Sequence, residues 1–227
     1  MIFKNPNKNI EVENFRIKLS DTLLTIHENT KFLGIFLDQH LCFTTHIQHL
    51  VRQLNYVSLM FKHVRRYFNE KTMLGLYYTF FYPFLIYGIE FWGHASKTEL
   101  NKVLILQKQV LRIILNIKAE DSITPSFKKY KIMPVNMLFK FRLLLHFLKT
   151  FTREKLRGMS VDHDYGTGYR DIAYLKTSRF RTNKGQRSMF YTAVLLYNQY
   201  LNDCEGISLD IIRVRLAERL WEGDWEN

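Results

Sequence analysis

The hydrophobic pattern of this chain changes its period near residue 40, and this change limits the folds that the chain can adopt. Residues 14–37 alternate apolar and polar side chains, as strands with one buried face do, and Gly34 lies where the chain turns between two such runs. From about residue 41, apolar side chains recur every three to four positions, which is the spacing of an amphipathic helix. The pattern predicts an α+β fold that is mainly α, with a small antiparallel β-meander or hairpin ahead of a helical bundle and a helical C-terminal extension.

Local start signals indicate where further helices begin. These signals are N-cap residues, a capping box and prolines suited to a first helical turn, and they occur at Asn69, Ser96-x-x-Glu99, Thr124-Pro125 and Met133-Pro134. Glycines and basic residues in 157–187 predict a loop region, which two more helical patterns follow. We expect three domains, at residues 1–40, 41–156 and 157–227.

The charge of the chain is strongly positive and unevenly distributed. The 227 residues carry a formal net charge of +12; the basic excess lies mainly in residues 97–187, whereas residues 203–227 are acidic in balance. A basic field of this size attracts polyanions, of which nucleic acid is the commonest, and an anionic membrane surface is the alternative. Only two cysteines occur, Cys42 and Cys204, which excludes a disulfide framework and indicates a reducing, intracellular compartment.

An uncharged stretch at residues 72–89 has the length of a transmembrane helix. It contains four tyrosines together with Pro83 and Gly88, and basic residues flank it on one side only. A helix that is apolar on all sides can equally form the centre of a soluble bundle. We expect the bundle, and a membrane-associated protein anchored by residues 72–92 is the less favoured alternative.

Three groups of residues could carry chemistry, and each has a simpler interpretation. Cys42, His46 and His49 could share a helix face as metal ligands, but a fourth ligand is not apparent nearby. The Asp-His-Asp run at residues 162–164 lies among glycines, where a solvated loop is the better interpretation. Cys204 lies between two acidic residues, which disfavours a reactive thiolate. We predict no metal site in this chain.

Two adjoining segments carry motifs, Lys31-Phe32-Leu33-Gly34-Ile35 and Leu41-x-Phe43-x-x-His46-Ile47. The first resembles a strand of the primer-grip hairpin in reverse transcriptases of non-LTR (LINE-type) retrotransposons, and the second resembles the opening of their thumb. Further parts of the resemblance follow in the order of that family: Tyr78 to Trp92, Leu106-Gln107-Lys108, Arg112-Ile113-Ile114, Ile132 to Val135, Ser178-Arg179, Gly185 to Ser188 and Tyr197-Asn198.

The resemblance relates each expected domain to a part of a reverse transcriptase. It implies that residues 1–40 are the end of a palm, a palm remnant with a primer-grip-like hairpin. Residues 41–156 would be a helical thumb, and residues 157–227 a basic loop with a helical C-terminal extension. The implied function is that of a truncated fragment of an RNA-directed DNA polymerase that retains template–primer binding.

The resemblance also implies that this chain alone is inactive as a polymerase. The family holds two Mg²⁺ ions with an Asp on one strand and an aromatic-x-Asp-Asp turn. No Asp-Asp pair occurs in this sequence, and neither Asp21 nor Asp38 has that context. We therefore expect no catalytic residue and no metal cofactor in this chain. The implied partner is RNA, DNA or an RNA/DNA hybrid, in the nucleus or cytoplasm, without a membrane or a small-molecule substrate.

Two sets of residues are predicted to contact nucleic acid. The primer-grip-like set is Lys31, Phe32, Leu33 and Gly34. The second set is basic and would bind phosphates independently of sequence: Arg52, Lys62, Arg66, Lys102, Lys108, Arg112, Lys128, Lys140, Arg142, Arg179 and Arg181. The alternative hypothesis is a domesticated basic helical module that binds RNA, DNA or another protein. A preference for RNA/DNA hybrid over free duplex would separate the two hypotheses.

Overall fold

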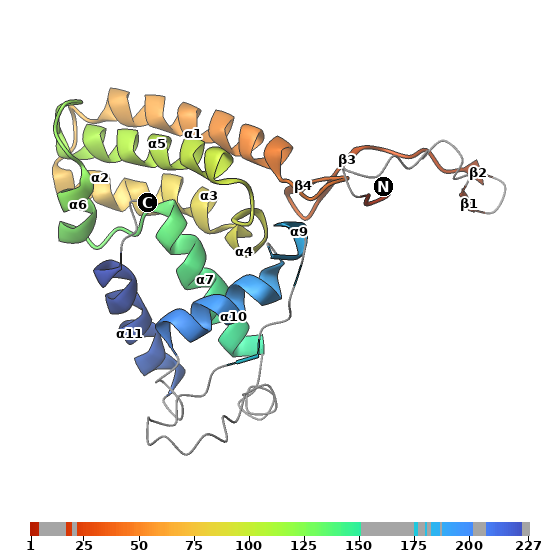
Figure 1. Ribbon diagram of the computed structural model, residues 1–227. Helices are drawn as coiled ribbons and strands as arrows, with labels where there is room; N and C mark the ends of the chain where they lie inside the picture. The colour runs from red at the N-terminus through yellow and green to blue at the C-terminus, as the bar shows by residue number, and fades with distance from the viewer. Residues whose placement is uncertain are drawn as a thin grey trace, which may run out of the picture. The chain divides into compact units, whose positions relative to one another are not determined.

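The computed structural model of this chain describes residues 1–4, 17–19, 22–150, 175–176, 180, 183–186, 188–201 and 208–223. The strands are β1 (Lys18–Leu19), β2 (Thr22–Leu23), β3 (Asn29–Phe32) and β4 (Ile35–Asp38). The helices are α1 (Thr44–Val64), α2 (Glu70–Leu76), η2 (Tyr77–Phe81), α3 (Tyr82–Ile86), α4 (Ile89–Trp92), α5 (Lys97–Leu115), α6 (Thr124–Lys129), α7 (Val135–Thr150), α9 (Asn183–Gln186), α10 (Met189–Tyr200) and α11 (Leu209–Glu222). The predicted α+β class, mainly α, is confirmed (Figure 1).

The chain divides into two compact units. Unit 1 consists of residues 1–84 and 95–114, and unit 2 consists of residues 85–94 and 115–227. Unit 1 contains the four strands together with α1, α2, η2 and α5, whereas unit 2 contains α4, α6, α7, α9, α10 and α11. The chain crosses between the units at three points: inside α3, between α4 and α5, and just before the last residue of α5.

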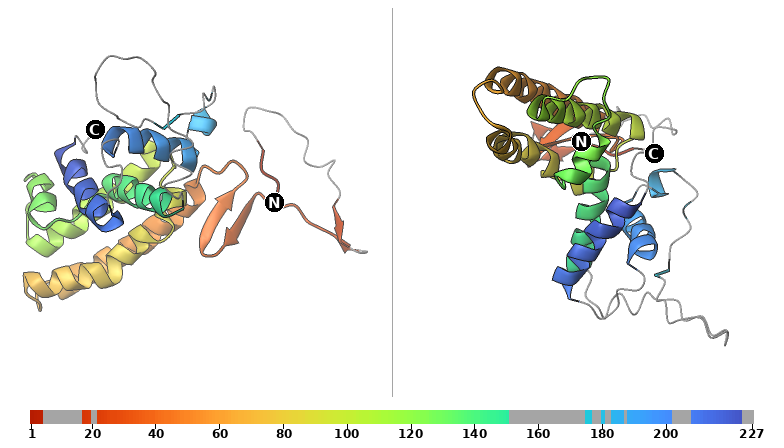
Figure 2. Two further views of the ribbon diagram at one scale, coloured as in Figure 1. Left: turned by 90° about the horizontal axis from the view of Figure 1, so that it is seen from below. Right: turned by 90° about the vertical axis from the view of Figure 1, so that its left-hand side faces the viewer.

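Both strand pairs are antiparallel, and the second is a tight hairpin at the N-terminal end of α1 (Figures 1 and 2). The register between β3 and β4 ends at Phe32 opposite Ile35, so only Leu33 and Gly34 form the turn. Their φ angles are 46° and 81°, and two positive values are typical of a type I′ hairpin turn. The expectation that the strands bury one face is wrong for this hairpin. Every residue of β3 is exposed and β4 is half-buried, because a two-stranded ribbon has no second layer to cover it.

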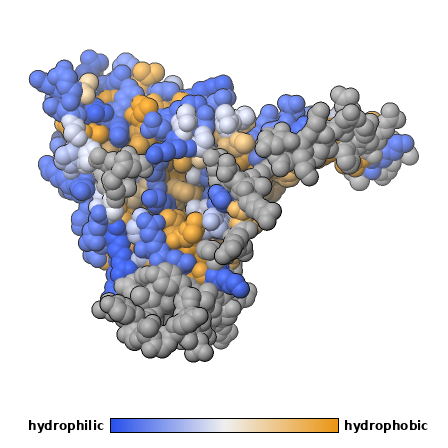
Figure 3. Space-filling model, in the orientation of Figure 1, coloured by the Kyte–Doolittle hydropathy of each residue, from blue (hydrophilic) through white to orange (hydrophobic). Residues whose placement is uncertain are grey.

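The helices of unit 1 bury the apolar stripes that the sequence pattern predicts. On α1 the buried residues are His46, Ile47, Leu50, Leu54, Val57, Ser58 and Phe61. On α5 they are Val103, Leu104, Leu106, Gln107, Val110, Leu111 and Ile114. Arg65 joins the C-terminal end of α1 to α5, because its Nε donates to the Ile113 carbonyl at 3.1 Å. The outward sides of these helices are mostly hydrophilic, with apolar side chains between the polar ones (Figure 3).

Residues 72–89 do not form one continuous α-helix. The stretch begins in α2, widens into the π-helical turn η2 and continues through α3 to Gly88, whose φ of 61° separates α3 from α4. Tyr77 and Phe81 of η2 are fully buried and stack with ring centres 5.4 Å apart. Gln107 of α5 donates to the Tyr77 hydroxyl at 3.0 Å, which pairs two buried polar groups. Among the described residues, no helix combines the length and apolar character needed to span a membrane.

Unit 2 is organised around α7, against which α4, α10 and α11 each pack. Gly93, directly after α4, approaches α7 so closely that a Cβ atom there would collide with the Phe139 ring. On α10, Asn198 holds a distant part of the backbone: it accepts from the Leu175 N–H at 2.9 Å and donates to the Leu175 carbonyl at 3.0 Å. A glycine and an amide side chain thus set two of the close contacts within this unit.

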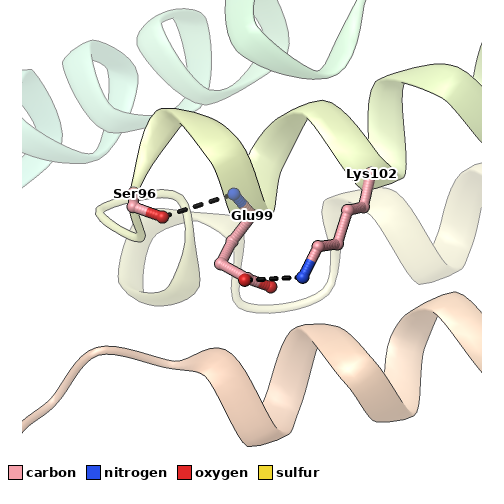
Figure 4. A network of polar contacts seen from close by, with 3 residues as sticks. All are labelled: Ser96, Glu99 and Lys102. Carbon is pink, nitrogen blue, oxygen red and sulfur yellow. Dashed lines mark hydrogen bonds and ion pairs between the residues drawn. The ribbon is translucent and has the colours of Figure 1, made fainter.

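The predicted helix starts are confirmed. Ser96 Oγ accepts from the N–H of Glu99 at 3.3 Å, and the Glu99 carboxylate binds Lys102 Nζ at 2.6 Å (Figure 4). Asn69 Oδ1 caps α2 by accepting from a backbone N–H at 2.9 Å. The two proline signals also mark helix starts, α6 at Thr124 and α7 at Val135. The predicted loop at 157–187 lies largely outside the described residues.

Candidate nucleic-acid interface

The primer-grip-like residues lie at the tip of the β3–β4 hairpin. Phe32 and Leu33 are 62% and 74% exposed, so two large apolar side chains stand in solvent at the turn. Lys31 Nζ lies 5.5 Å from the centre of the Phe36 ring on the opposite strand, within cation–π distance. The register places Lys31 with Phe36 on one face of the ribbon and Phe32 with Ile35 on the other, so the tip offers a cation and exposed apolar side chains on different faces. Groups of these two kinds suit the phosphate and the sugar of a nucleotide.

Asp38, the last residue of β4, connects this hairpin to α1. Its Oδ1 accepts from the N–H groups of His40 at 2.9 Å and Cys42 at 3.0 Å, and its Oδ2 accepts from the N–H of Phe43 at 2.7 Å. Asp38 therefore acts as a turn and helix-start residue. The carboxylate satisfies three backbone donors of the segment ahead of α1, and one of them, the N–H of the N-cap residue Phe43, belongs to the groups that a helix start leaves without a partner in the helix.

His46 is buried in the first turn of α1 and faces the hairpin. Its Nδ1 lies 3.5 Å from the N–H of Phe36, at the long limit of a hydrogen bond. Burial, with a smaller contribution from neighbouring His49, lowers the pKa of His46 to about 4. The ring is consequently neutral at neutral pH and able to accept from the strand. The motif that contains His46 thus helps to connect β4 to α1.

The basic residues of α1 lie outside its buried stripe, Arg52 on the opposite side and Lys62 at the edge of the stripe. Arg52 and Lys62 are exposed, as is Arg66 just beyond the helix. The Arg66 guanidinium carbon is 4.9 Å from the centre of the Tyr67 ring, which is a cation–π arrangement. Exposed apolar side chains share this side of α1: Tyr56, Leu59 and Met60. The side combines positive charge with surfaces on which a base could stack.

On α5, three predicted basic residues face away from the buried stripe. Lys102 is paired with Glu99, and a partly exposed pair of this kind contributes little to stability. Lys108 and Arg112 are both half-buried and are spaced i, i+4, so they are neighbours on the helix surface. Ile105 lies exposed on the same side. Helix α5 therefore brings two of the three predicted cations, Lys108 and Arg112, together as a stripe that does not include Lys102.

Unit 2 carries the remaining described residues of the basic set. Lys128 is exposed on α6. On α7, burial lowers the pKa of the Lys140 ammonium group. Arg142, also on α7, donates through Nε to the Glu90 carboxylate at 3.0 Å, so part of its charge is already balanced. Arg179 and Arg181 lie outside the described residues.

The described residues do not fit a divalent metal ion. Among them, no group of three His, Cys, Asp or Glu side chains is placed to hold one. The Asp38 carboxylate is occupied by backbone donors, Cys42 is exposed and His46 is buried against the hairpin. Residues 162–164 and Cys204 lie outside the described part of the chain. The Mg²⁺ of the resembled polymerases thus finds no carboxylate cluster in that part.

Two kinds of contact were not predicted from the sequence. Lys31 and Phe36 face each other across the hairpin, and the two-residue turn would have revealed this pair once the register was known. Glu90 and Arg142 are 52 positions apart in sequence and form an ion pair because α4 packs on α7. No local sequence pattern predicts that pair.

Comparisons with known proteins agree with the resemblance to reverse transcriptases. No model of a known protein family matches this chain, and no solved structure matches it. The RNA-directed DNA polymerase from mobile element jockey of Drosophila melanogaster is 31% identical over 101 residues, which cover 43% of this chain and 11% of that protein. The probable RNA-directed DNA polymerase from transposon BS of the same species is 31% identical over 104 residues, with the same two shares. The jockey polymerase of Drosophila funebris is 31% identical over 105 residues.

The match is partial in both directions. The chain spans 11% of the length of these polymerases, and the matched segment covers 43% of the chain. Three such matches nevertheless confirm the resemblance to reverse transcriptases of non-LTR retrotransposons. This chain is therefore similar to one part of the RNA-directed DNA polymerases of non-LTR retrotransposons.

Proposed function

We propose that this chain is a nucleic-acid-holding part of a retrotransposon-type RNA-directed DNA polymerase. The observation that carries the proposal is the similarity to three such polymerases, over 101 to 105 residues. The net charge of +12 supports it, because a polyanion is the natural partner of such a chain. The proposed ligand is a template–primer of RNA and DNA, bound in the nucleus or cytoplasm.

Two surfaces of unit 1 would make the contacts. The stripe of Lys108 and Arg112 on α5 would bind phosphates, which carry no sequence information. The hairpin tip, with exposed Phe32 and Leu33, would contact the sugar or base of a nucleotide. Binding through these surfaces should depend steeply on salt and weakly on sequence.

Polymerisation is not part of the proposal for this chain alone, and no small-molecule substrate is proposed. The motive is the lack of a carboxylate cluster among the described residues, together with the occupied carboxylate of Asp38. Incubated with a primed RNA template, deoxynucleotides and Mg²⁺ or Mn²⁺, the purified chain should extend no primer. Templated extension that survives Asp38→Asn would contradict this account.

The binding surface is tested by the salt dependence of affinity for a fluorescent RNA/DNA hybrid. Each phosphate contact contributes about −0.9 to the slope of log affinity against log salt on duplex DNA. Replacing Lys108 and Arg112 together by Gln should flatten this slope by about 1 to 2. Lys71→Gln with Lys97→Gln removes the same charge from exposed positions elsewhere in unit 1 and should change it much less. Equal slopes in the two double variants would show that the α5 stripe does not contact phosphates.

The same titration separates the proposal from a domesticated basic module. A template–primer holder should bind the RNA/DNA hybrid more tightly than DNA duplex of the same length, because a hybrid has a shape nearer the A-form. Binding that is equally salt-dependent but shows no preference for the hybrid would favour the general module.

A further inference from the structure

The segment between β4 and α1 follows an unusual backbone path. Leu41 and Phe43 have φ angles of 52° and 59°, a region that residues other than glycine, asparagine and aspartate rarely adopt. Around this path, the Asp38 carboxylate accepts three N–H bonds of 2.7 to 3.0 Å. Bonds to an ionised acceptor are among the stronger hydrogen bonds in proteins. Asp38 therefore holds the connecting segment in a conformation that its residues would not choose by themselves.

The first turns of α1 meet the hairpin from the other side of this segment. His46 accepts from the Phe36 N–H at 3.5 Å, and the rings of His49 and Phe36 have centres 4.9 Å apart. Thr45 Oγ1 donates to the Asn29 side chain at 3.4 Å, so β3 is contacted as well as β4. Helix α1 packs directly on β4. The hairpin and the start of α1 are thereby connected through both strands.

These contacts have a consequence for the exposed tip. The strands contribute little apolar burial of their own, since β3 is exposed along its whole length. We call the contacts of Asp38, Thr45, His46 and His49 at the base of the hairpin the joint. The direction in which the tip points is therefore set by this joint rather than by a core beneath the hairpin. A preset direction lowers the entropy that must be lost when a ligand orders the tip.

We propose that Asp38 is a positioning residue for nucleic-acid binding: it fixes the β3–β4 hairpin to α1, so that the hairpin tip and the basic helices of unit 1 engage one nucleic acid together. The inference rests on the proposed function and assigns to Asp38 a role without contact to the ligand. Loss of the joint should weaken binding about three- to tenfold, the cost of ordering one or two more side chains. It should leave the salt slope unchanged, because no phosphate contact is lost.

The test measures the affinity of the full chain for the fluorescent RNA/DNA hybrid at one salt concentration and across a salt series. Asp38→Ala removes the three bonds. Asp38→Asn retains one acceptor oxygen, and its affinity should lie between that of Asp38→Ala and that of the unsubstituted chain. Glu28→Gln removes the same charge from an exposed residue beside β3. Asn69→Ala removes the cap of α2 and lowers stability away from the hairpin.

Electrostatics alone predict the opposite sign. Removing a carboxylate makes the chain more positive, so Asp38→Ala and Glu28→Gln should both bind more tightly if charge is what matters. The proposal requires Asp38→Ala to bind more weakly than Glu28→Gln and Asn69→Ala. The effect of Asp38→Ala is then measured again in a chain that already carries Leu33→Ala. Most of the loss of affinity should disappear there, because a tip that no longer contacts the nucleic acid needs no positioning.

The outcomes separate this inference from the proposed function. If replacement of Lys108 and Arg112 flattens the salt slope while Asp38→Ala binds like Glu28→Gln, the positioning role is overturned and the binding function stands. If the unsubstituted chain shows no salt-dependent binding, both are overturned. Should Asp38→Ala fail to keep its helical circular dichroism, the comparison of Asp38→Asn with Glu28→Gln decides by the same criterion.

Discussion

The β3–β4 hairpin and the helical bundle of unit 1 are stabilised in different ways. In the bundle, Tyr77, Phe81 and Val110 are fully buried, so apolar packing and one internal pair of polar groups carry the stability. In the hairpin, Phe32 and Leu33 are largely exposed, and hydrogen bonds at Asp38 connect the ribbon to α1. Apolar residues on one face of a strand are buried only where a second layer covers them. The bundle should therefore respond to lost volume, and the hairpin to lost polar contacts.

The sharpest contrast is expected between two phenylalanines. Phe81→Ala opens a cavity in the bundle and should lower the free energy of unfolding by about 3–5 kcal/mol. Phe32→Ala removes an exposed side chain and should change it by less than about 0.5 kcal/mol. Urea denaturation followed by circular dichroism measures both. Similar losses in the two variants would show that the hairpin tip is part of a core.

Amide hydrogen exchange should report the same contrast without a substitution. Residues 31–37 have few buried apolar contacts and should open far below the global free energy of unfolding. Residues 100–114 of α5 should exchange only through global or near-global opening. Equal protection of the two segments would contradict the view that the hairpin is held mainly by its joint.

The polar pair inside the bundle provides an intermediate effect. Tyr77→Phe removes the hydroxyl that accepts from Gln107, and should cost about 1–2 kcal/mol for leaving a buried amide donor without this acceptor. Tyr78→Phe removes the hydroxyl of an adjacent, half-exposed tyrosine and should be close to neutral. Equal destabilisation by the two variants would show that the Gln107 pair is unimportant.

The joint should make stability depend on pH. Burial lowers the pKa of His46 to about 4 from its ordinary 6.5, so the unfolded chain binds more protons between these values. The stabilising contribution of the neutral ring is therefore complete above pH 6.5 and declines as the pH falls towards 4. His94, whose pKa burial also lowers to about 4, acts in the same direction, so His46→Gln should remove only part of the dependence. His63→Gln, at an exposed position, is the control. The free energy of unfolding is measured by urea titration at each pH, and an unchanged pH dependence in His46→Gln would contradict a stabilising contact of the neutral His46 ring with the hairpin.

The smallest expected effect is a gain at the hairpin turn. Leu33 has a φ of 46°, and asparagine adopts such a conformation at lower cost than leucine. Leu33→Asn should stabilise the hairpin against local opening by about 1 kcal/mol or less. Hydrogen exchange at residues 32–36 measures the change. Leu33→Ile, which introduces a β-branched side chain at the same φ, should shift the opening free energy in the opposite direction.

Much of the helical part of the fold could be predicted from the sequence. The helical spacing of apolar residues on α1 and α5 and the starts marked by Ser96 and Asn69 agree with the structure. These features depend on residues within one or two helical turns, so the local pattern contains the information. The π-helical turn of η2 was not predicted, because a run of apolar residues has no polar face from which a change of period could be seen.

The candidate site was predictable in its composition and less so in its geometry. The sequence by itself determined that the chain changes from strand to helix near residue 40, that it is basic, and that its motifs resemble part of a polymerase. Only the tertiary structure decided that Phe32 and Leu33 are exposed, that Glu90 balances Arg142, and that His46 is neutral against the hairpin. The physical reason is that burial and pairing depend on groups brought together by packing. Periodicity records which side of an element a residue occupies, but not whether another element covers that side.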